Sequence, residues 1–227
     1  MGIDAVPCEV EVDVATRGFG KPAIVGLPDA AVKESLERVH TALHNSGYGW
    51  PQYRVLINLA PADIRKEGLA FDLPIALGVI FGSDAGSPDR AAQYLIAGEL
   101  ALDGRVRPIK GAMSMAMLAR ERGLAGVVVP RENAAEAAVV SEVEVYGVGT
   151  LAEAVGFLTE QLPLEATNID LEAAFAQASQ YEEDFSEVRG QESVKRALVV
   201  AAAGGHNILT LGTSASSRLN WRSPQAL

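Results

Sequence analysis

A change of composition between Thr159 and Phe185 limits what this chain of 227 residues can fold into. The segment is acidic and has few branched apolar residues, so it cannot bury enough surface to form a core. We interpret residues 161–186 as an acidic linker, in which 171–178 are able to form a short helix. Residues 1–160 are long enough for one domain, because about 150 folded residues bury roughly 70% of their unfolded surface.

Within residues 1–160 the hydrophobic pattern changes repeatedly between the period of a strand and the period of a helix. Cys8–Val14 alternates apolar with acidic residues, which is typical of a half-buried strand. Asp29 can cap a helix that ends near Gly47 and carries an apolar stripe. Further strands are predicted at 21–25, 53–59, 126–129 and 143–148, further helices at 73–81, 111–122, 132–140 and 151–158, and a hairpin at 98–106 that turns at Asp103-Gly104. This mixed order predicts an α/β (α+β) fold.

A second domain is predicted to begin after the linker, at residues 187–212. A helix from Gln191 to Ala203 is followed by two glycines and by the short apolar strand Asn207–Gly212. A helix and a strand that ends in glycine are how a nucleotide-binding α/β domain starts.

The residues after that strand do not form a phosphate-binding loop. Such a loop has the spacing G-x-x-x-x-G-K-[ST], in which backbone N–H groups and the lysine hold the phosphates and the hydroxyl holds magnesium. Gly212 takes the place of the first glycine, but Ser217, Arg218 and Leu219 replace the second glycine, the lysine and the hydroxyl residue. Gly212 is therefore predicted to be vestigial, with no metal ligand nearby. We read 213–227 as an aberrant tail and expect a truncation or frameshift just after Gly212, rather than a naturally degenerate tail.

Charge and cysteine content restrict the partners. The net charge of −10 makes the chain a poor nonspecific ligand for nucleic acid. A local basic patch is conceivable around Arg54, Arg65 and Lys66, where a solvated surface is the favoured interpretation. Cys8 is the sole cysteine, so no intramolecular disulfide can form, and it is predicted to be a small buried hydrophobe. The sequence has no apolar run of about 18 residues and no signal-peptide pattern, which predicts a cytoplasmic protein without membrane contact.

Several strings together resemble one family, the magnesium-chelatase-like AAA+ ATPases of the ComM (YifB) type. They are Gly26–Ser35, Asn58–Asp63, Arg65–Gly68, Phe71–Ala76 and Gly190-Gln191, within a match that runs from about Gly2 to Gly212. The resemblance implies a Lon-protease-like, ribosomal-S5-domain-2-like domain at residues 1–160, then the start of an AAA+ domain. It also implies ATP and Mg²⁺ in full-length relatives, with neither expected for this chain. Family proteins start roughly ten residues earlier, so the chain is expected to be short at both ends.

The Lon-like resemblance raises the question of peptidase activity. Lys66–Ala70 lines up with the Lon segment that carries the catalytic serine, and Pro108–Met113 with the segment that carries the lysine. Ala70 and Met113 then stand at the serine and lysine positions, and neither side chain can serve a Ser–Lys mechanism. An acid–base pair of Lys66 and Asp72 is disfavoured against a reading as loop structure and solvated charge. No catalytic residue is therefore predicted.

Two functions of different classes remain. The favoured one is a truncated member of these ATPases, whose full-length relatives couple ATP hydrolysis to DNA processing, namely branch migration in natural transformation. This chain itself is expected to have neither ATPase nor protease activity. The alternative is a non-enzymatic module for homo-oligomerisation, as in an AAA+ ring, or for partner docking.

Overall fold

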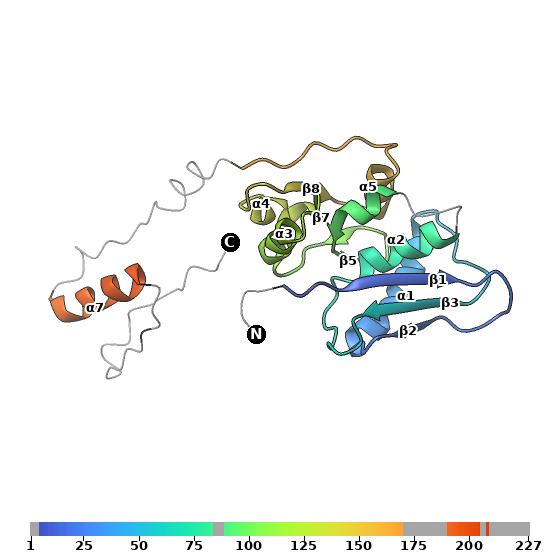
Figure 1. Ribbon diagram of the computed structural model, residues 1–227, viewed down its shortest axis with the longest axis horizontal. Coiled ribbons are helices and arrows are strands. Elements are labelled where there is room, and N and C mark those ends of the chain that lie inside the picture. Colours follow the sequence, from blue (N-terminus) through green and yellow to red (C-terminus); the bar gives the residue numbers. More distant parts are fainter. Residues whose placement is uncertain (1–4, 84–88, 170–189, 205–207, 209–227) are drawn as a thin grey trace. The chain divides into compact units, whose positions relative to one another are not determined.

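The computed structural model describes residues 5–83, 89–169, 190–204 and 208. These belong to two units, Met1–Ile169 and Asp170–Leu227. The first unit contains helices together with parallel and antiparallel strand pairs, so the predicted α/β (α+β) class is confirmed (Figure 1).

The first sheet has three strands with two helices packed on one of its faces. Strand β3 (Val55–Ala60) lies in the middle, antiparallel to β1 (Glu9–Val14) and parallel to β2 (Ala23–Val25). In Figure 1, helix α1 (Ala30–Asn45) passes behind the strands, and helix α2 (Asp72–Ser83) runs above β1. Helix α2 approaches β1 closely, because a Cβ atom on Gly78 would lie 2.5 Å from Val12 Cγ2.

Strand β1 shows the predicted alternation. Val10, Val12 and Val14 pack against the core, while the acidic residues between them are exposed. Since successive side chains of a strand point to opposite faces, the second face of this sheet carries the row Glu9, Glu11 and Asp13.

Helix α1 begins and ends where its capping residues predict. The Asp29 carboxylate accepts a hydrogen bond of 2.7 Å from the Val32 amide, and Gly47 has a φ of +83° just beyond the helix. The predicted apolar stripe is buried, with Ser35 buried beside it. The serine was not part of the prediction.

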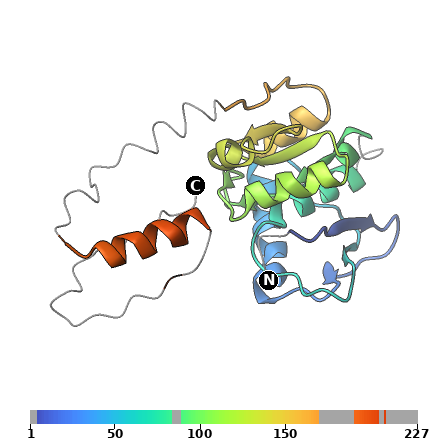
Figure 2. The same ribbon diagram turned by 60° about the vertical axis from the view of Figure 1, so that its left-hand side comes forward.

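The second sheet is parallel and lies deeper in the unit. Its order is β4 (Tyr94–Ile96), β7 (Gly126–Pro130) and β8 (Glu144–Val148). Every residue of β7 is buried, as predicted for 126–129. Figure 2 brings forward α3 (Ala112–Glu121), which packs on this sheet. The remaining elements here are η1 (Asp89–Gln93), η2 (Arg131–Asn133), α4 (Ala134–Ala137) and α5 (Leu151–Leu158).

Two predictions in this region need correction. Strand β4 and the short helix η1 before it were not predicted. The helix predicted at 132–140 is a 3-10 turn followed by the single α-turn α4, because a buried Asn133 occupies the junction between them. The hairpin is confirmed, with β5 (Glu99–Leu100) antiparallel to β6 (Val106–Arg107).

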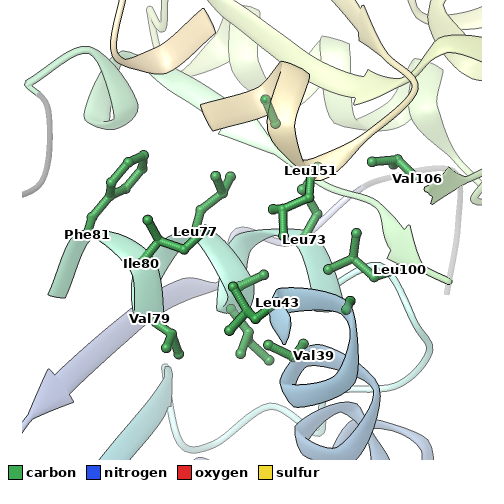
Figure 3. Packing of buried hydrophobic residues seen from close by; sticks show 14 of the residues in the cluster. Val39, Leu43, Leu73, Leu77, Val79, Ile80, Phe81, Leu100, Val106 and Leu151 are labelled. Carbon is green, nitrogen blue, oxygen red and sulfur yellow. The ribbon is translucent and has the colours of Figure 1, made fainter. Parts of the chain in front are cut away.

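Two hydrophobic clusters share the second sheet. The larger cluster lies between the two sheets, and Figure 3 shows Leu73 and Leu77 of α2 between Val39 and Leu43 of α1 and Leu151 of α5. The smaller cluster joins α3 and α4 to the other face of β7 and β8. Strand β7 serves both, since Val128 belongs to the larger cluster and its neighbours to the smaller one.

The second unit is described over one helix, α7 (Glu192–Ala203), which confirms the helix predicted at 191–203. The strand predicted at 207–212, Gly212 and the helix proposed at 171–178 lie outside the described residues. No helix in the described part of the chain is long and apolar enough to span a membrane.

Candidate functional site

The two residues at the Lon catalytic positions lie in separate hydrogen-bond networks. Ala70 precedes α2 by two residues, and its carbonyl accepts a hydrogen bond of 2.9 Å from the Gly98 amide. Met113 lies in the first turn of α3, and its side chain packs against the smaller cluster. No hydrogen bond between described residues joins Ala70 to Met113.

The residue that organises the region near Ala70 is Asp72, at the first position of α2. Its carboxylate is fully buried and accepts hydrogen bonds from two other elements, α1 and β5. Ser35 Oγ donates to Oδ1 at 2.5 Å, Arg38 Nε donates to Oδ2 at 2.9 Å, and the Leu100 amide donates to Oδ2 at 3.2 Å. We refer to Ser35, Arg38 and Asp72 as the Asp72 network. It connects α1, α2 and the β5–β6 hairpin.

Arg38 supplies the positive charge that makes burial of this carboxylate tolerable. Its Nη2 donates to Asp72 Oδ1 at 3.0 Å, so the guanidinium engages both carboxylate oxygens. The hydrogen bonds to Asp72 raise the pKa of Arg38 above its usual value. The same Nη2 also donates to the Ala31 carbonyl, which ties the arginine to its own helix.

The Asp72 network holds elements of the fold together and is not arranged for catalysis. Ser35 is completely buried, and its hydroxyl donates to Asp72 while accepting from Arg38 at 3.1 Å. A serine nucleophile needs an adjacent base and access for its substrate. Ser35 has no such access, and its proton points to a carboxylate already paired with arginine.

The prediction that Lys66 and Asp72 are solvated charges is wrong. Lys66 is only 3% exposed, and its Nζ donates to the Pro61 carbonyl. Its backbone amide donates to the Leu27 carbonyl, and its carbonyl accepts from the Asp29 amide. Both side chains are buried because hydrogen bonds replace the water that a charge would otherwise require.

The basic patch suggested around Arg54, Arg65 and Lys66 does not form. Arg54 comes directly before β3, and Arg65 follows the loop after it, so six residues of extended strand separate them. At roughly 3.3 Å per residue this distance is about 20 Å. Arg65 is in addition paired with Glu67 at 3.4 Å.

The segment at the other Lon position, Pro108–Met113, is held by a second set of polar contacts. Asn133 accepts from the Ile109 amide at 2.8 Å and donates to the Ile109 carbonyl at 2.9 Å. Glu136 accepts from Asn133 at 3.0 Å and from the Met113 amide at 3.2 Å. We call Asn133 and Glu136 the Asn133 clamp. It places a carboxylate at the N-terminus of α3, where the helix dipole favours negative charge.

Other features of the described residues offer no reactive group. No three His, Cys, Asp or Glu side chains among them are placed to hold a metal ion. Cys8 is half-buried, and burial raises the pKa of its thiol. A shallow pocket of about 250 Å³ is lined by Tyr48, Gly49, Trp50, Pro51, Ile80 and Ser83, away from both Lon positions.

The fold and these contacts define a mixed α/β protein whose most buried polar groups hold helices and loops together. Comparison with known proteins agrees with the sequence strings that cover the same segments. The family model "Subunit ChlI of Mg-chelatase" matches residues 10–133, and the model "Magnesium chelatase, subunit ChlI" matches residues 184–219. The chain therefore belongs to the magnesium-chelatase-like AAA+ family of the ComM and YifB type.

Individual relatives support the same assignment. The chain is 40% identical to the competence protein ComM of Haemophilus influenzae over 99% of its own length and 45% of that protein. It is 37% identical to the uncharacterized protein YifB of Escherichia coli, over 97% of the chain and 44% of YifB. Lon protease 1 of Thermus thermophilus is 32% identical over 57% of the chain and 17% of the protease. The chain thus spans less than half the length of the ComM and YifB relatives it matches.

Sequence reasoning missed the Asp72 network, although one signal was present. Ser35 follows Val32 by three residues and Arg38 follows Ser35 by three, so all three share one side of α1. A serine and an arginine beside a buried stripe require a polar partner on the facing element. Asp72, at the start of the apolar run 73–81, was the nearest candidate in the sequence.

Proposed function

We propose that residues 1–160 form a Lon-protease-like, ribosomal-S5-domain-2-like domain without peptidase activity. The observation that carries this proposal is the chemistry of the two aligned positions, Ala70 and Met113. Alanine has no nucleophilic atom, and methionine cannot take up a proton as lysine does. The serine of the Asp72 network, Ser35, is fully buried and closed off from solvent.

Residues 187–212 are proposed to begin an AAA+ ATPase domain, and residues 161–186 to link it to the first domain. The donor set at 212–219 does not fit ATP and Mg²⁺. Ser217 lacks the dihedral freedom of glycine, Arg218 offers a planar fork in place of a compact ammonium, and Leu219 has no oxygen for magnesium. We therefore expect no ATP hydrolysis by this chain.

The whole protein in this family is proposed to use ATP hydrolysis for work on DNA, as in branch migration during natural transformation. The resemblance in the strings from Gly26 to Ala76 and the similarity to a competence protein support this role. The residues of this chain would contribute to it by positioning and contact, not by catalysis.

The first experiment measures phosphate release from ATP by the purified chain in the presence of Mg²⁺. Background hydrolysis is expected, equal to that of the variant Arg218→Ala. Hydrolysis that elutes with the chain in gel filtration and is lost in Arg218→Ala would contradict the proposal.

A second experiment measures cleavage of fluorescently labelled casein. No cleavage is expected from the chain. Ser114, which follows Met113 in α3, serves as the control. If cleavage were observed and Ser35→Ala abolished it while Ser114→Ala did not, the Asp72 network would be an active site and the structural interpretation would be wrong.

The alternative function, a non-enzymatic module for oligomerisation or docking, is favoured by the edge strand β2. Val25 and Leu27 at its end are 45% and 54% exposed. Light scattering coupled to gel filtration tests this alternative. A stable oligomer that Val25→Lys dissociates would support it, and a monomer at every concentration would count against it.

A further inference from the structure

One end of the first sheet carries exposed aromatic and basic side chains that the proposed function has not used. Three segments meet there: the loop after β1, the start of β2 and the residues before β3. The Ala15 amide donates to the Arg54 carbonyl at 3.0 Å and fixes the loop to the start of β3. We define the sheet-end patch by its five side chains, Arg17, Phe19, Lys21, Tyr53 and Arg54.

The two aromatic rings of the sheet-end patch face solvent. Phe19 is 88% exposed, the most exposed of the large apolar residues in the described part of the chain, and Tyr53 is 41% exposed. Their ring centroids are 6.1 Å apart with planes tilted by 34°. Leaving a phenylalanine ring almost entirely in water forgoes the stabilisation that burial would bring. A flat partner that stacks on these rings would recover it.

The three cations of the patch are exposed and, within the described residues, form no ion pair. Three other exposed arginines, Arg65, Arg105 and Arg131, each contact a carboxylate within 4 Å. The stem of Arg54 lies over Gly20, where an added Cβ would be 3.1 Å from Arg54 Cδ. The glycine therefore leaves room for the arginine to lie flat against the loop, close to Phe19.

We propose that the sheet-end patch binds single-stranded nucleic acid, with bases stacked on Phe19 and Tyr53 and phosphates held by the three cations. Exposed aromatic rings among basic side chains are the combination that proteins use for single strands, because every base has a face and every nucleotide a phosphate. Two rings give too little apolar surface to anchor the domain in a bilayer. The inference rests on the proposed role in DNA processing and names where this domain touches the strand.

The first test titrates the full chain with a fluorescein-labelled oligo(dT) of 20 nucleotides and follows anisotropy at low salt. Three phosphate contacts predict that the logarithm of the binding constant falls with the logarithm of the salt concentration with a slope of about 2. The double variant Arg17→Glu/Lys21→Glu is expected to bind about tenfold more weakly, with a slope below about 1. The control Arg120→Glu/Arg122→Glu has the same net charge and reverses two exposed cations at the end of α3, so it should bind like the unaltered chain.

A second test separates stacking from charge. Phe19→Ala is expected to weaken binding about fivefold or more while leaving the salt slope unchanged, since base stacking is insensitive to counterions. Leu102→Ala, which shortens another exposed apolar side chain, should have no effect. Nuclear magnetic resonance of the same titration should shift the amides of the loop after β1 and those before β3. A parallel titration with oligo(rU) shows whether the patch distinguishes ribose from deoxyribose.

Each other outcome overturns the assignment in a recognisable way. If oligo(dT) binds but both double variants weaken it equally, the contact lies elsewhere and the role in DNA processing still stands. If no oligonucleotide binds, the patch is not a nucleic-acid site, and ATP hydrolysis remains a separate question. If Phe19→Ala abolishes binding to phosphatidylserine vesicles, or converts a dimer to a monomer, the patch serves a membrane or a second copy.

Discussion

The Asp72 network and the Asn133 clamp do similar work with different chemistry. Each fastens the segment that aligns with one Lon catalytic loop, the first near Ala70 and the second near Met113. The Asp72 network pairs a fully buried carboxylate with Arg38, whose side chain is 21% exposed, next to residues of the larger hydrophobic cluster. The Asn133 clamp uses a neutral amide, with Glu136 partly exposed beside it.

This difference determines how each site should respond when it is broken. Removing one member of a buried ion pair leaves the other charge without a partner or water, which costs more than the pair itself contributes. Removing a buried amide leaves two neutral backbone groups unsatisfied, and each costs about 1–3 kcal/mol or less if water reaches it. A single substitution should therefore lower the free energy of unfolding more in the Asp72 network than in the Asn133 clamp.

The largest effect is expected from Asp72→Ala. This variant removes the hydrogen-bond acceptor of both Arg38 and Ser35, so the free energy of unfolding should fall by about 3–5 kcal/mol. Urea denaturation followed by circular dichroism measures the change. Asp103→Ala removes an exposed carboxylate paired with Arg105 and should change the free energy of unfolding far less, because solvent screens that pair. Equal losses in the two variants would remove the distinction between buried and exposed pairs.

A substitution in the Asn133 clamp should lower the free energy of unfolding by less. Asn133→Ala removes both hydrogen bonds to Ile109, and we expect a loss of about 2 kcal/mol. Hydrogen exchange at the Ile109 amide should accelerate more than exchange in β1. Asn45→Ala, which removes an exposed amide bonded to the Leu102 carbonyl, is the matched control. If Asn133→Ala destabilised the chain as much as Asp72→Ala, charge would not be the deciding factor.

A smaller effect is expected at the cap of the helix that carries Ser35 and Arg38. Asp29→Ala removes the acceptor for the Val32 amide and should cost about 1 kcal/mol. Asp29→Ser retains a capping oxygen and should recover most of this loss in thermal unfolding. A serine variant as unstable as the alanine variant would show that the charge of Asp29, not its hydrogen bond, matters.

The smallest effect at neutral pH concerns Tyr146 on β8. Burial, together with its hydrogen bond to Glu144, raises the pKa of Tyr146 to about 12. Between pH 10 and 12 the unfolded chain loses this proton while the folded chain keeps it, so stability should fall as the pH rises. Tyr146→Phe should flatten that fall in urea titrations and change stability little at pH 7. An unchanged slope above pH 10 would contradict this assignment, and Glu144→Gln should give an intermediate slope.

Local patterns predicted those elements whose residues carry their own signal. The alternation of β1, the cap and stripe of α1, the apolar run of α2 and the hairpin glycine all act over a few residues, and all are found in the structure. Strand β4 has only three residues, and its place depends on parallel pairing with β7 some thirty residues later. No local period could reveal it.

The candidate site was harder to predict for the same reason. A charge at the start of an apolar run is ordinarily a solvated first-turn residue, and that is how Asp72 was interpreted. Its burial depends on Arg38, which lies 34 residues earlier in the chain. The placements of Ala70 and Met113 as non-catalytic positions come from resemblance to Lon and remain predictions.

The spans closed by the two polar sites also bear on the order of folding. Asp72 bonds to groups 34 and 37 residues before it and 28 residues after it, whereas the Asn133 clamp closes spans of 24 residues or fewer. Before such a bond can form, the two residues must come together, and the entropic cost of closing the chain between them grows with its length. The shorter spans of the Asn133 clamp are therefore closed more readily. We therefore expect the Asp72 network to form later in folding than the Asn133 clamp. In stopped-flow measurements, loss of the network should act more on the unfolding rate, and loss of the clamp more on the refolding rate.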